Sequence, residues 1–510
     1  MIADIIHRLS LPASLALLMG MLLSLESNVN GNEIRKSPHG LISTEVEPAE
    51  IFNCRFPSDR RFSPAISDNI PADPGNKSTP EPALNPIREN LHPIRGEKDD
   101  FNLLIERIGD AQFVLLGEST HGTHEFYKAR REITWRLIKE KGFTAVAIEA
   151  GWSFASPLNR YIQLNDAMTI MEALADFKRY PGWVWRNKDT LEFINQLKDY
   201  NAAFQGNSTK IGIYGLDLYG LYSSIDKVTG YLDKYDAQAA KRARLRYSCF
   251  DSFDKDPQKY ANAASADPSI SCESEAEEQL LDLNQNAFEY LNRNISDAQK
   301  EFFNAQQNAR LIKNAEKYFR ALYEHEENSP HSWNLRDRHM MEMLEALVQY
   351  IETSKNNNKV VVWAHNSHVG NAEASDMSRR GELNIGQLLR KRYGSKAVLI
   401  GFVTNTGSVI ASSAWGGLVE HKQLLPALEE SYAALFHKEN VPCFYLILNE
   451  NQELATYLNR ERLQRAVGVI YLPDTERKNH YDHARLADQF DAVIYFDKTS
   501  AVEPLDKMSE

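Results

Sequence analysis

Histidine and glutamate side chains directly follow three apolar segments of this sequence, and these residue types can carry acid–base chemistry. Glu118 and His121 stand three residues apart just after FVLLG, and Glu149 ends the segment TAVAIE. His365 and His368 follow VVVWA with the same spacing of three. A carboxylate at the end of a buried strand is costly unless it is paired. Gathered at one site, these groups supply a general base, its orienting partner and an oxyanion or metal site.

Each cluster also has a purely structural explanation. A glutamate at a strand end often caps a neighbouring loop, and a lone histidine is more often a hydrogen-bonded structural residue than a catalyst. Three such clusters after three apolar segments favour the functional interpretation. Ser119 and Ser367 lie near the histidines, but the sequence lacks the G-x-S-x-G elbow that exposes the serine of an α/β-hydrolase. We therefore do not expect a serine nucleophile.

A metal site and a nucleotide site are two other kinds of site to consider for this sequence. Imidazole and carboxylate ligands suit Zn²⁺ or Mn²⁺, so Glu118, Glu149, His365 and His368 form an alternative ligand set. Their spacing matches no established zinc motif. The sequence also lacks the glycine-rich loops that bind nucleotide phosphates. We expect an acid–base site without a bound cofactor, and a metal site stays the alternative.

The segments that must position these side chains alternate between short apolar runs and longer amphipathic ones. Many short runs are continuous and rich in β-branched residues, which is typical of strands covered on both faces. Helical stretches such as residues 125–141 and 190–204 fill the intervals. The pattern predicts an α/β fold with a central, largely parallel sheet flanked by helices. The predicted strands are residues 113–117, 145–149, 211–216, 360–364, 398–403, 444–448, 469–472 and 492–496.

Residues 218–358 interrupt this alternation. They hold abundant helix formers, over 275–326 and 333–354, but no convincing strand. We predict a helical insertion or cap subdomain there. Because ligands of open α/β sheets bind at the C-terminal ends of the strands, such a cap would cover the site.

The N-terminal part differs in composition from the rest. Residues 9–25 carry no charge, so we predict residues 1–27 to be a signal peptide or an N-terminal anchor. Eight of the 20 prolines fall within residues 57–93, which predicts a proline-rich disordered linker over 28–93. The folded domain is then expected over 94–510.

Composition narrows the class of ligand. The chain has 510 residues, of which 43% are hydrophobic and 25% charged, so it can bury a large core. The net charge of −12 argues against nucleic-acid binding and against a polybasic mode of membrane binding. Membrane association is expected only through the N-terminal segment. The four cysteines form no C-x-x-C pair, and free thiols are expected, although a pairing of Cys249 with Cys272 stays open.

Many blocks of the sequence, in order, closely resemble the erythromycin esterase family. The resemblance runs from about residue 94 to residue 505. The blocks are GESTHGTHEFY, GFTAVAIEAGW, YPGWVWRN, IGIYGLDLYG, RYSCFD, VVVWAHNSHVGNA, ELNIGQLLRKRYG, GVIYLPDTERKNHY and QFDAVIYFD.

The resemblance implies a metal-independent hydrolase that opens macrolide lactones, the activity behind antibiotic resistance, by activating a water without a covalent intermediate. The general base of the family falls on His121. The supporting carboxylates, the histidines after the V-W-A strand and an arginine of the first helix fall on Glu118, Glu149, His365, His368 and Arg130.

We therefore predict a hydrolase of small-molecule esters or lactones. The alternative is a metal- or haem-binding module of the related G-E-x-x-H fold without hydrolytic turnover. Because the apolar residues 9–25 have no counterpart in the family, an extracytoplasmic or cell-envelope location is favoured over a cytoplasmic one.

Overall fold

The structure is a computed structural model of the chain, and it describes residues 85–165, 167–203, 210–292, 297–323, 330–355 and 357–506. All of these residues belong to one compact unit that spans residues 48–510. The predicted N-terminal segment, residues 1–27, and most of the predicted linker lie outside the described residues. Within the described part, no helix is both long enough and apolar enough to cross a membrane.

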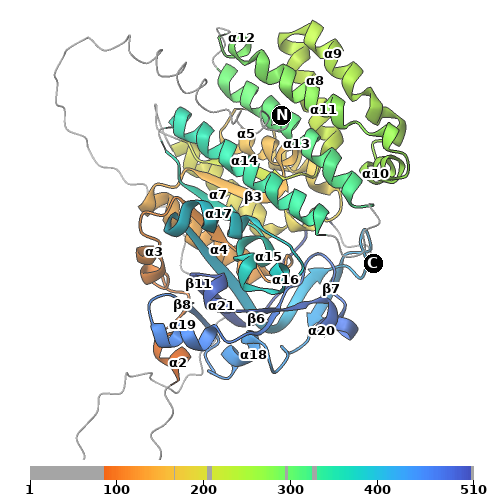
Figure 1. Ribbon diagram of the computed structural model, residues 1–510. Helices are drawn as coiled ribbons and strands as arrows, with labels where there is room; N and C mark the ends of the chain where they lie inside the picture. Colours follow the sequence, from red (N-terminus) through yellow and green to blue (C-terminus); the bar gives the residue numbers. More distant parts are fainter. Residues whose placement is uncertain are drawn as a thin grey trace, which may run out of the picture. The chain divides into compact units, whose positions relative to one another are not determined.

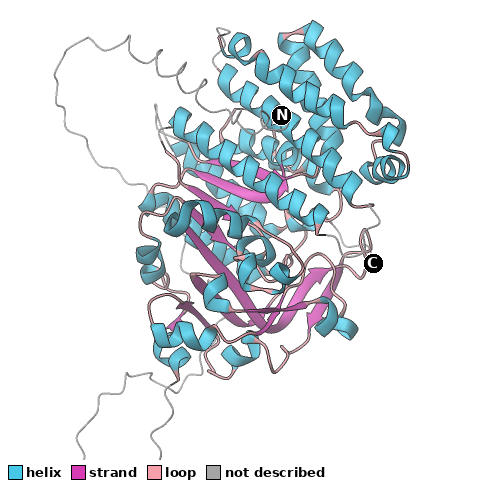
Figure 2. Cartoon of the chain, in the orientation of Figure 1, coloured by secondary structure: helices cyan, strands magenta, loops and turns pink. Residues whose placement is uncertain are grey.

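A nine-stranded sheet forms the centre of this unit (Figures 1 and 2). Its order is β1-β8-β11-β6-β2-β5-β3-β4, and β7 pairs with the long strand β6. The strands from β11 to β4 run parallel, whereas β8, β1 and β7 pair antiparallel with their neighbours. The bounds are β1 His92–Pro93, β2 Phe113–Leu116, β3 Ala145–Gly151, β4 Gly212–Asp217, β5 Val360–Trp363, β6 Ala397–Ala411, β7 Glu420–Leu424, β8 Cys443–Ile447 and β11 Ala492–Thr499, with a separate hairpin-like pair of β9 Arg462–Arg465 and β10 Tyr481–Ala484.

Helices connect the strands and cover both faces of the sheet (Figure 2). Those outside the long interval between β4 and β5 are α2 Pro86–Asn90, α3 Asn102–Ile108, α4 His124–Lys141, α5 Trp152–Ile162, α6 Ile170–Ala173, α7 Lys188–Ala203, α15 Asn366–Val369, α16 Asp376–Arg379, α17 Ile385–Tyr393, α18 Tyr432–His437, α19 Gln452–Leu458, α20 Glu476–Asn479 and α21 Leu486–Gln489.

Alternate residues of the central strands enter two different cores. Val114 and Val361 pack with α4 and α7 on one face, whereas Leu115 and Val362 pack with α14 and α17 on the other. A strand that is buried on both faces must be apolar at every position. This is why β2 and β5 are continuous apolar runs, and the predicted α/β fold with a largely parallel sheet is confirmed.

The long interval between β4 and β5 is helical throughout its described residues. In Figure 1 the green helices of this insertion gather beside the β4 edge of the sheet, and α14 packs against both α13 and β4. The insertion is thus anchored on the sheet by its last helix. Its helices are α8 Leu221–Tyr235, α9 Ala237–Tyr247, α10 Pro257–Ala266, α11 Glu273–Gln285, α12 Ala287–Leu291, α13 Ala298–Ala321 and α14 His331–Lys355.

Two predicted segments differ from the structure. Residues 469–472 are not a strand, because this apolar run forms only an isolated bridge between Ile470 and Ser412. Residues 85–93, which the sequence analysis assigned to a disordered linker, contain helix α2 and strand β1. Asn85 caps helix α2, in which Ile87 is fully buried, and β1 pairs with β8. Burial of Ile87 and the paired strand edge keep this proline-containing segment ordered.

The expectation of free cysteines is wrong for the described residues. Cys249 and Cys272 form a disulfide with a Cα–Cα distance of 6.0 Å, and Cys443 is also disulfide-bonded. The packing of α9 and α11 in the insertion brings the first two together across 23 residues of sequence. Cys54 lies outside the described residues.

Candidate active site

The chemistry-bearing residues gather at the C-terminal ends of four neighbouring strands, in the order β2-β5-β3-β4. Glu118 and His121 lie in the loop after β2, and Glu149 lies near the C-terminal end of β3. His365 and His368 follow β5, where they cap and enter the short helix α15. The structure therefore brings the three sequence clusters together, because parallel strands end at the same edge of a sheet.

A chain of ionic contacts leads from helix α4 to His121. Arg130 Nη2 lies 2.7 Å from Glu118 Oε2, and Glu118 Oε1 lies 2.8 Å from His121 Nδ1. Arg130 is fully buried, whereas the His121 side chain is 12% exposed. An ionised Glu118 accepts the Nδ1 proton, which leaves the lone pair of His121 on Nε2. His121 is thus oriented as a base.

Arg130 is held by ring faces as well as by charge. Its guanidinium carbon lies 4.4 Å from the ring centre of Tyr127 and 4.9 Å from that of Trp363. The adjacent Arg131 faces away and pairs with Glu192 at the surface. Of these two arginines, only Arg130 therefore supports the His121 motif.

His365 is neutral because of where it lies. Its Nδ1 accepts from the Ser367 amide at 3.2 Å and lies 2.8 Å from Ser367 Oγ, so the proton sits on Nε2. Burial, reinforced by the nearby His121, lowers the pKa of His365 to about 3. The Nε2 atom is buried and makes no hydrogen bond of normal geometry. The Ser119 backbone nevertheless lies close enough to raise the pKa of His365, although burial outweighs this effect.

His368 has the opposite protonation state. Burial alone would lower its pKa, but Asp337 and Glu149 outweigh burial and raise the pKa of His368 to about 9. Its Nδ1 lies 3.0 Å from both Asp337 carboxylate oxygens, and its Nε2 lies 3.3 Å from Glu149 Oε1. The ring of Trp333 stacks on it with centroids 4.6 Å apart. His368 is therefore a buried cation at neutral pH.

Glu149 joins the two histidine clusters. Its Oε2 accepts from the backbone amide of His365 at 2.8 Å, and its Oε1 accepts from Arg336 at 2.8 Å. Burial would raise the pKa of Glu149, but His368, His121 and Arg336 hold that pKa well below its usual range. The rings of His121 and His365 lie 5.0 Å apart. The charged carboxylate of Glu149 thus lies beside the imidazoles of both His121 and His365.

Three site residues were missed by the sequence analysis. Asp217 ends strand β4, and Arg336 and Asp337 come from helix α14 of the insertion. Asp217 carried a usable signal, since it ends an apolar strand just as Glu149 does. No sequence signal pointed to Arg336 or Asp337, because charged residues are ordinary in a long helix.

A glycine and an asparagine fix the two motifs next to each other. The backbone N–H of Asn366 donates to the Glu118 carbonyl at 2.8 Å. The side chain of Asn366 donates to the Phe402 carbonyl and accepts from the Phe402 backbone N–H. A Cβ placed on Gly117 would come within 2.1 Å of Asn366 Oδ1. Only glycine at residue 117 lets the loops after β2 and β5 approach this closely.

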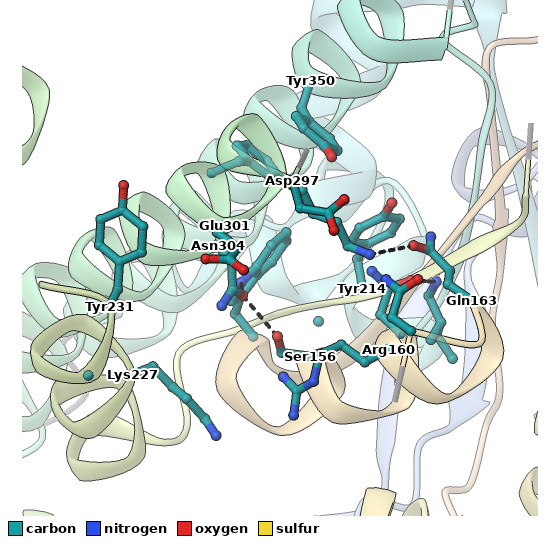
Figure 3. Close-up of a pocket in the computed structure, with 18 of the residues that line it drawn as sticks. Ser156, Arg160, Gln163, Tyr214, Lys227, Tyr231, Asp297, Glu301, Asn304 and Tyr350 are labelled. Atoms are coloured by element: carbon teal, nitrogen blue, oxygen red, sulfur yellow. Dashed lines mark hydrogen bonds between the residues drawn. The ribbon is translucent and has the colours of Figure 1, made fainter. Parts of the chain in front are cut away.

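A cavity of about 470 Å³ lies elsewhere, between β4, α5 and the insertion helices α8 and α13 (Figure 3). It is lined by Ser156, Arg160, Lys227, Asn304 and Tyr350 among others, and by none of the six predicted site residues. This cavity belongs to the junction between the insertion and the sheet, and not to the histidine cluster.

The alternative metal site has no preformed ligand group in the structure. Among the described residues, no three His, Cys, Asp or Glu side chains are arranged to hold a metal ion. The nitrogens of His368 and Nδ1 of His365 already face protein partners.

Comparisons with known proteins identify the relatives of the chain. The family model described as "Erythromycin esterase" matches residues 138–499, a range that includes Glu149, His365 and His368 but begins after Glu118, His121 and Arg130. Erythromycin esterase type II from Escherichia coli is 30% identical over 115 residues, which are 22% of this chain and 26% of that protein. The putative hydrolase YbfO from Bacillus subtilis is 22% identical over 327 residues, 62% of this chain and 69% of that protein. The matched stretch thus spans about a quarter of the first of these relatives.

Solved structures share the fold. A succinoglycan biosynthesis protein superposes with a TM-score of 0.67 at 22% identity, covering 82% of this chain and 96% of that one. A mutant of erythromycin esterase EreC in its open conformation gives a TM-score of 0.58 at 16% identity, covering 80% and 95%. At these identities the likeness concerns the fold alone.

The close approach of Gly117 to Asn366 predicts a loss of stability when a larger residue replaces Gly117. Gly117→Ala should lower the free energy of unfolding by about 1–3 kcal/mol, because the new methyl group displaces Asn366 from its backbone bonds. Gly230→Ala is the matched control, since a Cβ there meets nothing within 4 Å in helix α8 and should be neutral or slightly stabilising. Chemical denaturation measures both variants. Equal stability of Gly117→Ala and wild type would contradict the close approach.

A second prediction concerns His368 and pH. The folded-state pKa of about 9 lies above the unfolded value of about 6.5, so protonated His368 stabilises the fold fully below pH ~6.5. This contribution is lost as the pH rises toward 9. The stability difference between wild type and His368→Asn should therefore shrink by roughly 3 kcal/mol from pH 6 to pH 9.5. The exposed His437, replaced in the same way, should show a change below about 1 kcal/mol.

Proposed function

The chain belongs to the erythromycin esterase family, and from this membership and the site geometry we propose that it hydrolyses ester or lactone bonds of small molecules. Family membership by itself indicates a hydrolase. The proposal of ester or lactone hydrolysis rests on the ionic chain from Arg130 through Glu118 to His121. This chain ends at the Nε2 lone pair of His121, beside the neutral His365.

His121 is the general base in this proposal. Water is a poor nucleophile at neutral pH, so it needs a base such as imidazole to remove a proton as it attacks. Glu118 holds the required tautomer of His121 and stabilises its cation, as the acidic member of a catalytic triad does. Arg130 forms a direct salt bridge with Glu118 and so holds its carboxylate in place.

His365 supplies the complementary donor. A neutral imidazole with its proton on Nε2 can donate a hydrogen bond to the developing oxyanion without losing the proton. Two observations support this role: Nε2 makes no hydrogen bond of normal geometry, and the His365 ring lies 5.0 Å from the His121 ring. Glu149 lies close to both rings, and its negative charge favours the His121 cation that forms during the reaction.

The reaction then balances with one water. His121 Nε2 takes a proton from water as the water oxygen bonds to the carbonyl carbon, and the carbonyl electrons move to its oxygen. Collapse of this tetrahedral intermediate breaks the carbon–oxygen bond to the alcohol. The His121 cation returns its proton to the leaving oxygen, so the products are an acid and an alcohol, and no acyl-enzyme forms.

A serine mechanism fits the geometry less well. Ser367 Oγ lies 2.8 Å from His365 Nδ1, which is the distance expected of a nucleophile and its base. However, the lowered pKa of His365 makes this imidazole a weak base, and its Nδ1 is shared with the Ser367 amide. We therefore assign Ser367 to the orientation of His365.

The base assignment predicts a loss of turnover. His121→Ala should reduce the hydrolysis rate of any accepted ester or macrolide lactone by roughly 10²–10⁴-fold, as expected when a general base is removed. His124→Ala is the matched control, because His124 lies in the same motif but pairs with Asp189. Mass spectrometry of macrolides and aryl esters, with detection of the water-addition product, measures both variants. Full activity in folded His121→Ala protein would refute the assignment.

We also propose an extracytoplasmic or cell-envelope location, with membrane contact only through residues 9–25. The disulfide between Cys249 and Cys272 supports this, because such bonds persist mainly in oxidising compartments. N-terminal sequencing and cell fractionation should find a processed or membrane-bound chain. An intact Met1 on protein recovered wholly from the cytoplasm would contradict the proposal.

A further inference from the structure

One arginine of the helical insertion contacts the ends of three strands at once. Arg336 Nε and Nη2 lie 3.0 and 2.7 Å from the two carboxylate oxygens of Asp217, in a two-point contact at the end of β4. The same Nη2 donates to Glu149 Oε1 at 2.8 Å at the end of β3. Its Nη1 lies 3.2 Å from His368 Nε2, after β5.

These groups are buried and their charges nearly balance. The carboxyl groups of Glu149, Asp217 and Asp337 face two cationic groups, those of Arg336 and the protonated His368. Because His368 donates both its protons to carboxylates, its 3.2 Å contact with Arg336 is an approach of two cations, which the surrounding carboxylates tolerate. Removing either cation would leave buried carboxylates without compensation, which is strongly unfavourable.

The same helix also holds His368 from its other side. Trp333, Arg336 and Asp337 stand three and four residues apart on α14, so they lie on one face of the helix. Trp333 stacks on the His368 ring, and Asp337 bonds its Nδ1. Asp337 also accepts from the backbone amide of Ile385 at 2.9 Å, which ties α14 to α17.

We propose that Arg336 is a positioning residue that fixes the Glu149 carboxylate beside His365, so that the helical insertion is a structural part of the active site as well as a cover. The proposal rests on the hydrolase function proposed above. Glu149 has one oxygen on Arg336 and His368 and the other on the His365 amide, so its plane is fixed from two sides. The planar guanidinium is what permits a two-point grip on Asp217 together with a third contact.

The test compares Arg336→Gln with Arg338→Gln, which removes a charge from an exposed position two residues further along the same helix. In Arg336→Gln we expect kcat to fall about 10–100-fold, as for loss of a supporting contact, with a smaller change in KM. The acid limb of the pH–rate profile should move to higher pH, because removal of a buried cation favours protonation of a site in which Glu149 must stay charged and the base His121 must stay neutral. Arg336→Lys should restore part of the activity, and Arg338→Gln should match wild type.

A second measurement does not depend on turnover. Arg336 disfavours the cationic form of His368, so in Arg336→Gln the imidazole NMR titration of His368 should move to higher pH, whether or not an ester is hydrolysed. His368→Asn identifies the signal. If wild type hydrolyses no ester, the proposed function fails while this titration still decides the role of Arg336.

Two outcomes would overturn the proposal. One is an unchanged His368 titration in Arg336→Gln, and the other is a loss of kcat without movement of the acid limb, which indicates a purely structural residue. If Arg336→Gln does not fold, the double variant D217N/R336M removes both members of the pair, and it should shift the His368 titration in the same direction by a smaller amount.

Discussion

Buried charges at the ends of β3 and β4 are the constraint around which the site is organised. Glu149 and Asp217 lie at the ends of neighbouring strands of a sheet whose faces are both apolar, and their side chains are only 7% and 1% exposed. Isolated buried carboxylates would take up protons or unfold the region. Arg336 pairs with both carboxylates, and His368 pairs with Glu149; these two cations come from different segments of the chain. The segments must therefore be present together for the site to exist.

Close backbone approach is the second requirement, and small residues meet it. Gly117 allows Asn366 to bridge from the loop after β5 to strand β6, and Gly151 lies where a Cβ would come within 1.8 Å of the Tyr219 carbonyl. The contact between Gly117 and Asn366 places the His121 loop beside the His365 helix, and the contact between Gly151 and Tyr219 joins the segments after β3 and β4. The paired rings at 5.0 Å follow from this backbone geometry more than from any attraction between the imidazoles.

The two histidines of the V-W-A-H-N-S-H segment illustrate how surroundings divide chemical roles. His365 lies among backbone donors and near His121, and it is neutral; His368 lies between two carboxylates and is a cation. A neutral imidazole suits donation to an oxyanion, whereas a buried cation suits the fixing of a carboxylate. Pairs of identical groups with separated pKa values are a common feature of active sites.

Much of this organisation could be read from the sequence. Continuous apolar runs defined the buried strands, because a strand covered on both faces has no polar positions. The polar residues that follow those runs then had to meet at one sheet edge, which correctly brought Glu118, His121, Glu149, His365 and His368 together. The apolar run 469–472 misled the prediction, because its one β-bridge, from Ile470 to Ser412, is isolated and does not join it to the sheet as a strand. The proline-rich composition of residues 85–93 led to a prediction of disorder, but these residues are ordered because Ile87 is buried.

The sequence by itself determined the residue types, their local spacing and the strands that carry them. Only the tertiary structure decided that helix α14 crosses the ends of β3 and β4 and brings Arg336 and Asp337 into the site. It also decided the protonation states of His365 and His368. Local patterns cannot contain this information, because a pKa and an ion pair depend on the distance to residues more than a hundred positions away and on the exclusion of water around them.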